Sequence, residues 1–373
     1  MIDQDPFEDI RPYRDSEVRD VLDQVVADDE FVSSIVQLKY PRLSQYFSPL
    51  IAFAVRRVLK RAAGNINSVD DFQLQVRHYL EHALETSADD VTSSGCDRLE
   101  PNKAYLFICN HRDISMDPAL CNLILHQNGL STFRIAIGDN LLTKPYASHL
   151  MRLNKSFVVQ RSVSGRREKL DAFKKLSSYI RQSIVEESES VWIAQREGRA
   201  KTGVDRTDAA ILKMFLLSKS KEQTLSDAIR ELHIVPVAVS YQWDPLDVDK
   251  ARELVLKEND GEYLKDEHED VISIAKGITG YKGNIHVAFG SEITKEFGAV
   301  DELVDEIDYQ ILSMYHLHDS NLAAHARLTD QPLGSELEAA SDRFDKILAG
   351  LPTEYHQKLL ESYANPVVSH QSL

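Results

Sequence analysis

The sequence of 373 residues is poor in cysteine and contains no long apolar run. Its three cysteines, Cys96, Cys109 and Cys121, are too few and too close together to form a disulfide framework. No apolar run approaches the roughly 20 residues that a membrane-spanning helix needs, so any membrane contact is expected to be peripheral. The first residues also lack the basic and apolar layout of a secretory signal. These absences predict a cytoplasmic protein.

Basic residues are in the minority as well. The chain has 43 Lys and Arg residues against 59 Asp and Glu residues, which gives a formal net charge of −16. Proteins that bind nucleic acids must neutralise phosphates, so this balance argues against a nucleic-acid partner. Local basic patches are still compatible with an acidic total.

The first hundred residues show apolar residues at helical spacing and no convincing strand. Apolar positions recur every three to four residues in three segments, which are 16–38, 46–64 and 69–88. This periodicity predicts an N-terminal helical bundle over residues 1–100.

Residues 101–373 have a different hydrophobic pattern, in which short apolar runs alternate with helical stretches. The runs are 104–109, 133–138, 156–160, 190–195, 234–241 and 285–290. Apolar runs separated by helices favour an α/β domain with a largely parallel mixed sheet that helices flank. After about residue 296 the chain returns to acidic helical patterns, and the polar tail 364–373 is expected to be frayed.

Polar residues gather directly after several of these runs, where α/β sheets place their ligand sites. The residues are Asn110, His111, Arg112, Asp113 and Asp117 after the first run, Arg161 after the third, and Arg196, Glu197, Gly198, Arg199, Lys201, Thr202 and Gly203 after the fourth. They supply a base with a carboxylate partner, several cations, and glycines that let backbone N–H groups approach an anion. This combination is typical of transfer chemistry on a phosphorylated substrate.

Four segments, in order along the chain, resemble the sequence blocks of one enzyme family. They are "NHRDISMDP" (110–118), "FVVQRS" (157–162), "EGRAKTG" (197–203) and "IVPVAVSY" (234–241). The set resembles the glycerolipid acyltransferases, which esterify glycerol 3-phosphate or lysophosphatidate with a fatty acyl thioester. The third block is similar to the version found in bacterial and organellar glycerol-3-phosphate enzymes, and a helical bundle ahead of the α/β domain resembles the soluble plastid enzymes.

The resemblance implies a reaction and a set of roles. An acyl group would pass from acyl-CoA or an acyl carrier protein to glycerol 3-phosphate or 1-acylglycerol 3-phosphate, in phospholipid synthesis and without a metal or other cofactor. His111 would act as general base, and Asp117 would orient it. The remaining residues that the resemblance assigns to substrate binding are Arg161, Glu197, Gly198, Arg199, Lys201 and Thr202.

The spacing of the first block departs from the family. Five residues separate His111 from Asp117, where the family has four. If the extra residue bulges from the loop, the two side chains still meet; if it lies in a helix, Asp117 is rotated by about 100°. Asp113 and a lost carboxylate are the alternatives. We favour Asp117, because Pro118 marks a helix start.

Two other functions stay open at this point. The altered spacing is compatible with a non-catalytic homologue that binds lipid or an acyl carrier. In addition, "HYLEH" (78–82) fits the pattern of inverted zinc peptidases, with His78 and His82 on one helix face. The same pattern is also typical of a polar stripe on a bundle helix.

Two segments carry clusters of basic residues. In 46–64 an apolar first half precedes Arg56, Arg57, Lys60 and Arg61, and a second cluster covers 161–175. Such segments could contact an anionic membrane surface or an acidic acyl carrier protein, or be exposed bundle faces. We therefore expect a cytoplasmic protein with peripheral contact to the inner membrane surface.

Overall fold

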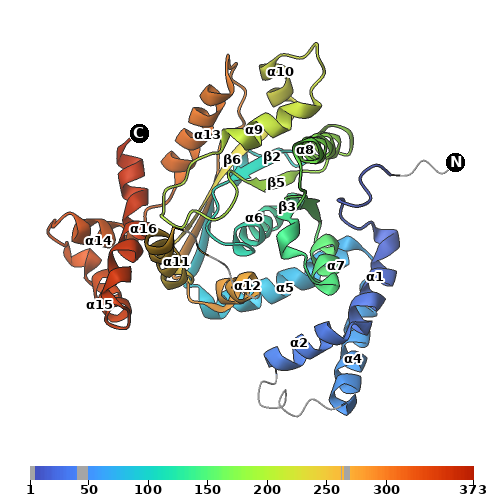
Figure 1. Ribbon diagram of the computed structural model, residues 1–373, viewed down its shortest axis with the longest axis horizontal. Helices are drawn as coiled ribbons and strands as arrows, with labels where there is room; N and C mark the ends of the chain where they lie inside the picture. Colours follow the sequence, from blue (N-terminus) through green and yellow to red (C-terminus); the bar gives the residue numbers. More distant parts are fainter. Residues whose placement is uncertain (1–4, 40–48, 262, 264–268) are drawn as a thin grey trace. The chain divides into compact units, whose positions relative to one another are not determined.

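The computed structural model describes residues 5–39, 49–261, 263 and 269–373 (Figure 1). The chain divides into two compact units, of which unit 1 spans 1–79 and 134–179 and unit 2 spans 80–133 and 180–373. The division at residue 100 that the sequence suggests stays a prediction. No helix in the described part of the chain is long and apolar enough to span a bilayer.

Unit 1 combines the N-terminal helices with a later α/β segment. Its elements are α1 (Asp15–Ala27), α2 (Asp29–Lys39), α4 (Pro49–Ala63), the first part of α5 (Val69–Ser87), β3 (Arg134–Gly138), the turn Asp139–Leu141, α7 (Pro145–Leu153), β4 (Ser156–Val159) and α8 (Arg166–Arg181). The three helical segments expected from periodicity are thereby confirmed, except that residues 46–48 lie outside the described residues.

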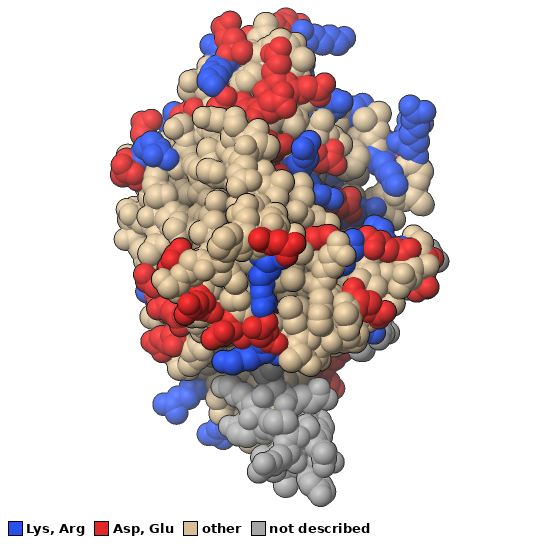
Figure 2. Space-filling view, turned by 90° about the vertical axis from the view of Figure 1, so that its left-hand side faces the viewer, with Lys and Arg blue, Asp and Glu red and all other residues tan. Residues whose placement is uncertain are grey.

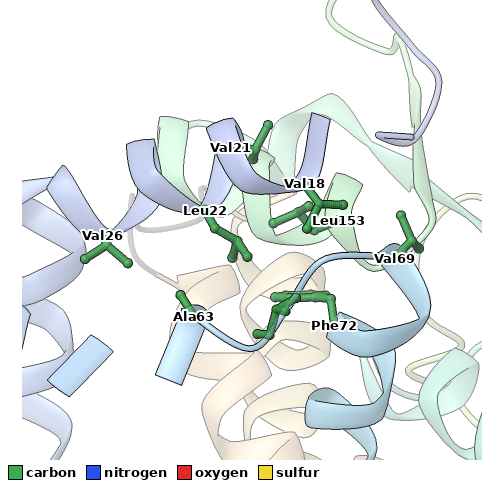
Figure 3. Close-up of a cluster of buried hydrophobic side chains, with 9 residues drawn as sticks. Val18, Val21, Leu22, Val26, Ala63, Val69, Phe72 and Leu153 are labelled. Carbon is green, nitrogen blue, oxygen red and sulfur yellow. The ribbon is translucent and has the colours of Figure 1, made fainter. Parts of the chain in front are cut away.

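A shared apolar core holds unit 1 together. Val18 and Leu22 of α1 pack with Phe72 of α5 and with Leu153, which belongs to α7 (Figure 3). The apolar positions of α1 repeat every three to four residues, so they form one buried stripe. Backbone bonds reinforce the contact, because Val158 N donates to the Ile10 carbonyl over 2.9 Å. The N-terminal helices therefore pack on residues that follow them by more than a hundred positions.

Unit 2 is built on five strands in the order β1-β7-β6-β2-β5. They are β1 (Asp90–Ser94), β2 (Leu106–Cys109), β5 (Val191–Ala194), β6 (Ile234–Tyr241) and β7 (Asn284–Phe289). The pairs β1/β7, β2/β5 and β2/β6 are parallel, as is β3/β4 in unit 1, whereas β6/β7 is antiparallel. Every apolar run identified in the sequence forms a strand, so the predicted α/β class with a largely parallel mixed sheet is confirmed.

Helices connect and follow these strands. They are Cys96–Arg98, α6 (Met116–Gln127), the π-helical turn Gln182–Glu186, α9 (Ala209–Phe215), Leu216–Ser218, α10 (Leu225–Arg230), α11 (Asp247–Asp260), α12 (Glu269–Thr279), α13 (Val300–Met314), α14 (Asp319–Leu328), Ser335–Leu337, α15 (Glu338–Ala349) and α16 (Thr353–Gln371). On the face shown in Figure 2, acidic and basic side chains are interspersed around an uncharged area.

The expectation that residues 1–100 contain no strand is wrong. β1 has no apolar run, since its sequence is DVTSS and it is mostly exposed at the sheet edge. Pairing with β7 makes it a strand, and His286 supports this pairing. The two ring nitrogens of His286 bond to Thr92 Oγ1 over 2.8 Å and to Ser94 Oγ over 3.0 Å.

The expectation of a frayed tail over 364–373 is wrong as well. α16 continues to Gln371, and Ala364, Pro366 and Val367 are buried. Ala364 belongs to a second core, in which Trp243 packs against Phe344, with ring centroids 5.2 Å apart. Apolar residues at only a few tail positions were enough to bury one face of the helix.

Candidate active site

A buried asparagine fixes the point where β2 ends. Asn110 is fully buried; its Oδ1 accepts from Val239 N over 2.7 Å and its Nδ2 donates to the Val239 carbonyl over 3.0 Å. On the other side, Gln195 N donates to the Cys109 carbonyl over 2.7 Å. The residues after Asn110 therefore leave the sheet from a position anchored to both neighbouring strands. Cys109 itself is fully buried.

His111 and Asp117 meet at this edge. His111 Nδ1 lies 3.0 Å from Asp117 Oδ2, and the Asp117 side chain is completely buried. The same Oδ2 accepts from the backbone N–H groups of Arg112 and Asp113, over 2.7 and 2.9 Å, while Tyr241 donates its hydroxyl to Oδ1 over 2.8 Å. Asp117 is therefore held from both oxygens and presents one of them to the imidazole.

The five-residue spacing is absorbed by the loop that precedes α6. Residues 112 and 113 turn their N–H groups towards Asp117, which stands in the first turn of α6 with Pro118 beside it. Asp113 has a different role: its Oδ1 accepts from Ser115 N and Met116 N, each over 2.9 Å, and so caps the helix. Burial, together with nearby Asp117, raises the pKa of the Asp113 carboxyl above its ordinary value.

The third sequence block lies against the histidine loop. Ala200 N donates to the His111 carbonyl over 2.8 Å, and Arg112 Nη2 donates to the Gly203 carbonyl over 3.3 Å. The His111 side chain is 14% exposed, and its ring lies edge-on to Trp192 with centroids 6.2 Å apart. The first and third blocks thus form one site with a partly open imidazole.

The substrate-binding candidates of this block differ in what they already contact. Arg199 is half-buried, and its Nη1 is buried with no hydrogen-bond partner among the described residues. Lys201 forms an ion pair with Glu253 of α11. Glu197, Gly198 and Thr202 are exposed, and Gly198 has a left-handed φ of +75°. Arg199 therefore has a guanidinium nitrogen without a hydrogen-bond partner among the described residues, as Arg112 does at Nε.

Next to the site, the side chain of Arg112 belongs to a cluster of buried charges that the sequence patterns did not predict. Arg112 Nη2 pairs with Asp205 over 2.9 Å, with both side chains at most 8% exposed. Lys250 donates to the Arg112 carbonyl over 2.7 Å and pairs with Asp244. Burial opposes the charged form of Arg112, but Asp205 and the neighbouring groups raise the pKa of its guanidinium above the ordinary value. These bonds hold the backbone and the side chain of Arg112, which directly follows His111.

Tyr241 is a residue of the site to which the sequence analysis gave no role. It stands at the end of the fourth block, and its hydroxyl reaches Asp117. Burial and the charge of Asp117 raise the pKa of this phenol well above its ordinary value, so it stays a donor. An apolar strand ending in a hydroxyl is the one signal in the sequence that could have pointed to it.

The remaining candidates belong to other segments of the chain. Arg161 follows β4 in unit 1 and is exposed, next to Ser162, whose N–H donates to Asp139 over 3.1 Å. His78 and His82 are exposed on α5, and His82 Nδ1 lies 3.0 Å from Glu85. In the part of the chain that the structure describes, no group of three or more His, Cys, Asp or Glu side chains is arranged to hold a metal ion.

A histidine bonded to a buried carboxylate at the ends of strands is an arrangement that can serve general-base chemistry, as in acyl transfer or hydrolysis. Residues 90–240 match the family model described as Acyltransferase, and this range includes His111, Asp117, the third block and β6. This segment of the chain therefore belongs to the acyltransferase family, and the resemblance noted from the four blocks is confirmed.

One similar solved structure is the 1-acyl-sn-glycerophosphate (LPA) acyltransferase PlsC from Thermotoga maritima. The two sequences are 12% identical, the alignment covers 80% of this chain and 92% of that chain, and the TM-score is 0.37. No curated protein sequence matches the chain.

The Arg112–Asp205 pair gives a prediction about stability. Asp205→Ala leaves a buried guanidinium unpaired and should lower the free energy of unfolding by about 3–5 kcal/mol, measured by urea denaturation followed by circular dichroism. The double variant Arg112→Met/Asp205→Leu removes both charges and should recover most of this loss. The control Asp208→Ala removes an exposed helix cap and should cost about 1 kcal/mol. Equal losses in the single and double variants would contradict the prediction.

Proposed function

We propose that this protein transfers a fatty acyl group from acyl-CoA or an acyl carrier protein to the hydroxyl of glycerol 3-phosphate or 1-acylglycerol 3-phosphate, as a step of phospholipid synthesis. The observation that carries the proposal is the contact of His111 Nδ1 with the buried Asp117, within the segment that matches the acyltransferase family. The two side chains meet despite their spacing, which supports a catalytic protein over a non-catalytic homologue.

His111 has the geometry of a general base. In the proposed tautomer, Nδ1 donates a hydrogen bond to Asp117, which leaves the lone pair on Nε2 for the acceptor hydroxyl. Nε2 takes the hydroxyl proton while the oxygen attacks the thioester carbonyl carbon. When the C–S bond of the tetrahedral intermediate breaks, the imidazolium returns the proton to the leaving thiolate. No covalent acyl-enzyme is needed, because a thioester is already electrophilic.

The third block is the proposed site for the acceptor. A phosphate oxygen could accept from the unpaired Nη1 of Arg199, since guanidinium groups bind phosphate through charge-assisted hydrogen bonds. Lys201 would have to share its charge with Glu253. Glu197 and Thr202 are the proposed contacts for the glycerol hydroxyls, and N–H groups near Gly198 the proposed oxyanion donors. Arg161 is retained as a proposed phosphate ligand.

Two surfaces of unit 1 suit the proposed partners. On α4 the exposed side chains of Phe53 and Val58, 66% and 68% exposed, accompany Arg57, Lys60 and Arg61. We propose that this face makes the peripheral contact with an anionic membrane. Arg56 is not counted, because it pairs with Asp29 of α2. The basic segment 161–175 is the proposed docking site for an acidic acyl carrier.

The first functional prediction concerns the base. His111→Ala should reduce acyl transfer by about a hundredfold to ten-thousandfold while the circular dichroism spectrum stays unchanged. The measurement is thiol release with long-chain acyl-CoA and glycerol 3-phosphate, repeated with 1-acylglycerol 3-phosphate and with acyl carrier protein as donor. Asp117→Asn should be similarly impaired.

The matched control for this experiment is His126→Ala, an exposed histidine on α6. It should keep full activity. A folded His111→Ala variant with near-normal turnover would show that the histidine is not the base. An unmodified protein that releases no thiol with either acceptor would refute the proposed reaction altogether.

The second functional prediction concerns the acceptor phosphate. Arg199→Ala should raise the KM for the acceptor by roughly 10- to 150-fold, since a charge-assisted contact is worth about 1.5–3 kcal/mol, and should leave the KM for the donor unchanged. Lys201→Ala should act in the same direction but less, because its charge is already paired. Arg196→Ala, an exposed neighbour, is the control. Equal changes for donor and acceptor would exclude Arg199 from the phosphate site.

The third functional prediction concerns the membrane. Each exposed cation on α4 should contribute about 1 kcal/mol near an anionic leaflet, so the triple change Arg57→Glu, Lys60→Glu and Arg61→Glu should abolish co-sedimentation with anionic vesicles at low salt. Activity on soluble substrates should be retained. The control carries the same charge change on α8, at Arg166, Arg167 and Lys169. If this control loses vesicle binding and the α4 variant does not, the membrane-binding face has been misassigned.

A further inference from the structure

The C-terminal helix α16 contacts the third sequence block directly. Asn365 Nδ2 donates to the Thr202 carbonyl over 2.7 Å. One residue further along the block, Gly203 approaches α16 so closely that a Cβ atom at its position would lie 2.1 Å from the Ser362 carbonyl oxygen. Gly203 also has a left-handed φ of +78°. Only glycine fits this position, because both its backbone angle and the space beside α16 exclude a side chain.

A proline within α16 explains why these two contacts are available. Pro366 lies inside the helix and has no N–H group, so the carbonyl of Ser362, four residues earlier, loses its usual helical partner. That carbonyl is the group that Gly203 approaches. Two polar groups of α16 therefore face the same loop, namely the Asn365 amide and the Ser362 carbonyl, which has no N–H group four residues later.

α16 is itself held rigidly. Tyr363, which is 4% exposed, donates its hydroxyl to Asp247 Oδ2 over 2.8 Å and accepts from Asp244 N over 2.9 Å. Its carbonyl accepts from Asn321 Nδ2 over 2.9 Å. These bonds connect α16 to α11 and α14, so the helix can fix the position of the loop it contacts.

The loop is thus held from two sides. Arg112 and the His111 carbonyl bind it on the side of the catalytic pair, through Gly203 O and Ala200 N respectively. In addition, Asn365 donates to its Thr202 carbonyl, and the Ser362 carbonyl lies against Gly203. These contacts fall on residues 200–203, and Arg199 directly precedes them, three residues before Thr202.

We propose that Asn365 is a positioning residue for acceptor binding, which acts through the Thr202 carbonyl on the third-block loop. The inference rests on the proposed function. It assigns a part in substrate recognition to a helix that lies outside the segment 90–240 matched by the family model. Because Asn365 does not touch the His111–Asp117 pair, its loss should change binding of the phosphorylated acceptor and leave the donor unaffected.

The test compares variants of α16 by steady-state kinetics with glycerol 3-phosphate and acyl-CoA, and by thermal unfolding. Asn365→Ala should raise the acceptor KM about three- to tenfold, the range for one hydrogen bond, with donor KM and Tm unchanged. Asn365→Gln, which keeps the donor, should restore most of the affinity. Gln357→Ala removes a side-chain bond to Glu361 on the same helix and is the control without effect.

Pro366→Ala separates positioning from stability. It returns an N–H group to the helix and draws the Ser362 carbonyl away from the loop, so Tm should stay the same or rise while the acceptor KM increases. Parallel changes in acceptor and donor KM, or an acceptor KM unchanged in Asn365→Ala, would overturn the inference. Both outcomes require an active unmodified enzyme, whereas failure of the proposed function would appear as no turnover in the unmodified protein.

Discussion

The site depends on one buried carboxylate. Asp117 accepts from two backbone N–H groups and from Tyr241 while it faces His111, so a charge that would be costly in the interior is paired with donors at both oxygens. The donors come from the loop after β2 and from the end of β6. Asp117 therefore joins two neighbouring strands to the start of α6, and the imidazole takes its orientation from this junction.

Further polar groups support this arrangement. Asn110 secures the end of β2 to Val239, and Arg112 pairs with Asp205 and donates to the Gly203 carbonyl of the third block. Each of these groups is buried, so each must be matched by a partner to be tolerated. The result is a loop whose backbone is defined along its length, although it belongs to no helix or strand. Such rigidity is what a positioned general base requires.

The C-terminal helices extend this principle beyond the family-matched segment. Trp243, just after β6, packs against Phe344 and Tyr363, so α15 and α16 share one core with Ala251 of α11. Through Tyr363 the helix α16 is bonded to the start of α11. The segment 90–240 of this chain is therefore followed by helices that share a core and, through α16, contact its third block.

The sequence by itself predicted the strands other than β1, the class of fold and the two residues, His111 and Asp117, that the structure brings together. An apolar run of about eight residues, such as 234–241, favours a strand that is buried on both faces. Polar residues that follow parallel strands of this kind then lie at one edge of the sheet. What only the tertiary structure decided are the features that depend on a distant partner. β1 is a strand because β7 pairs with it, the tail is a helix because the Trp243 core covers it, and Asp117 reaches His111 because two N–H groups fold the loop around its carboxylate. Periodicity reports the burial of a segment, whereas these contacts join segments far apart in the chain and leave no local pattern.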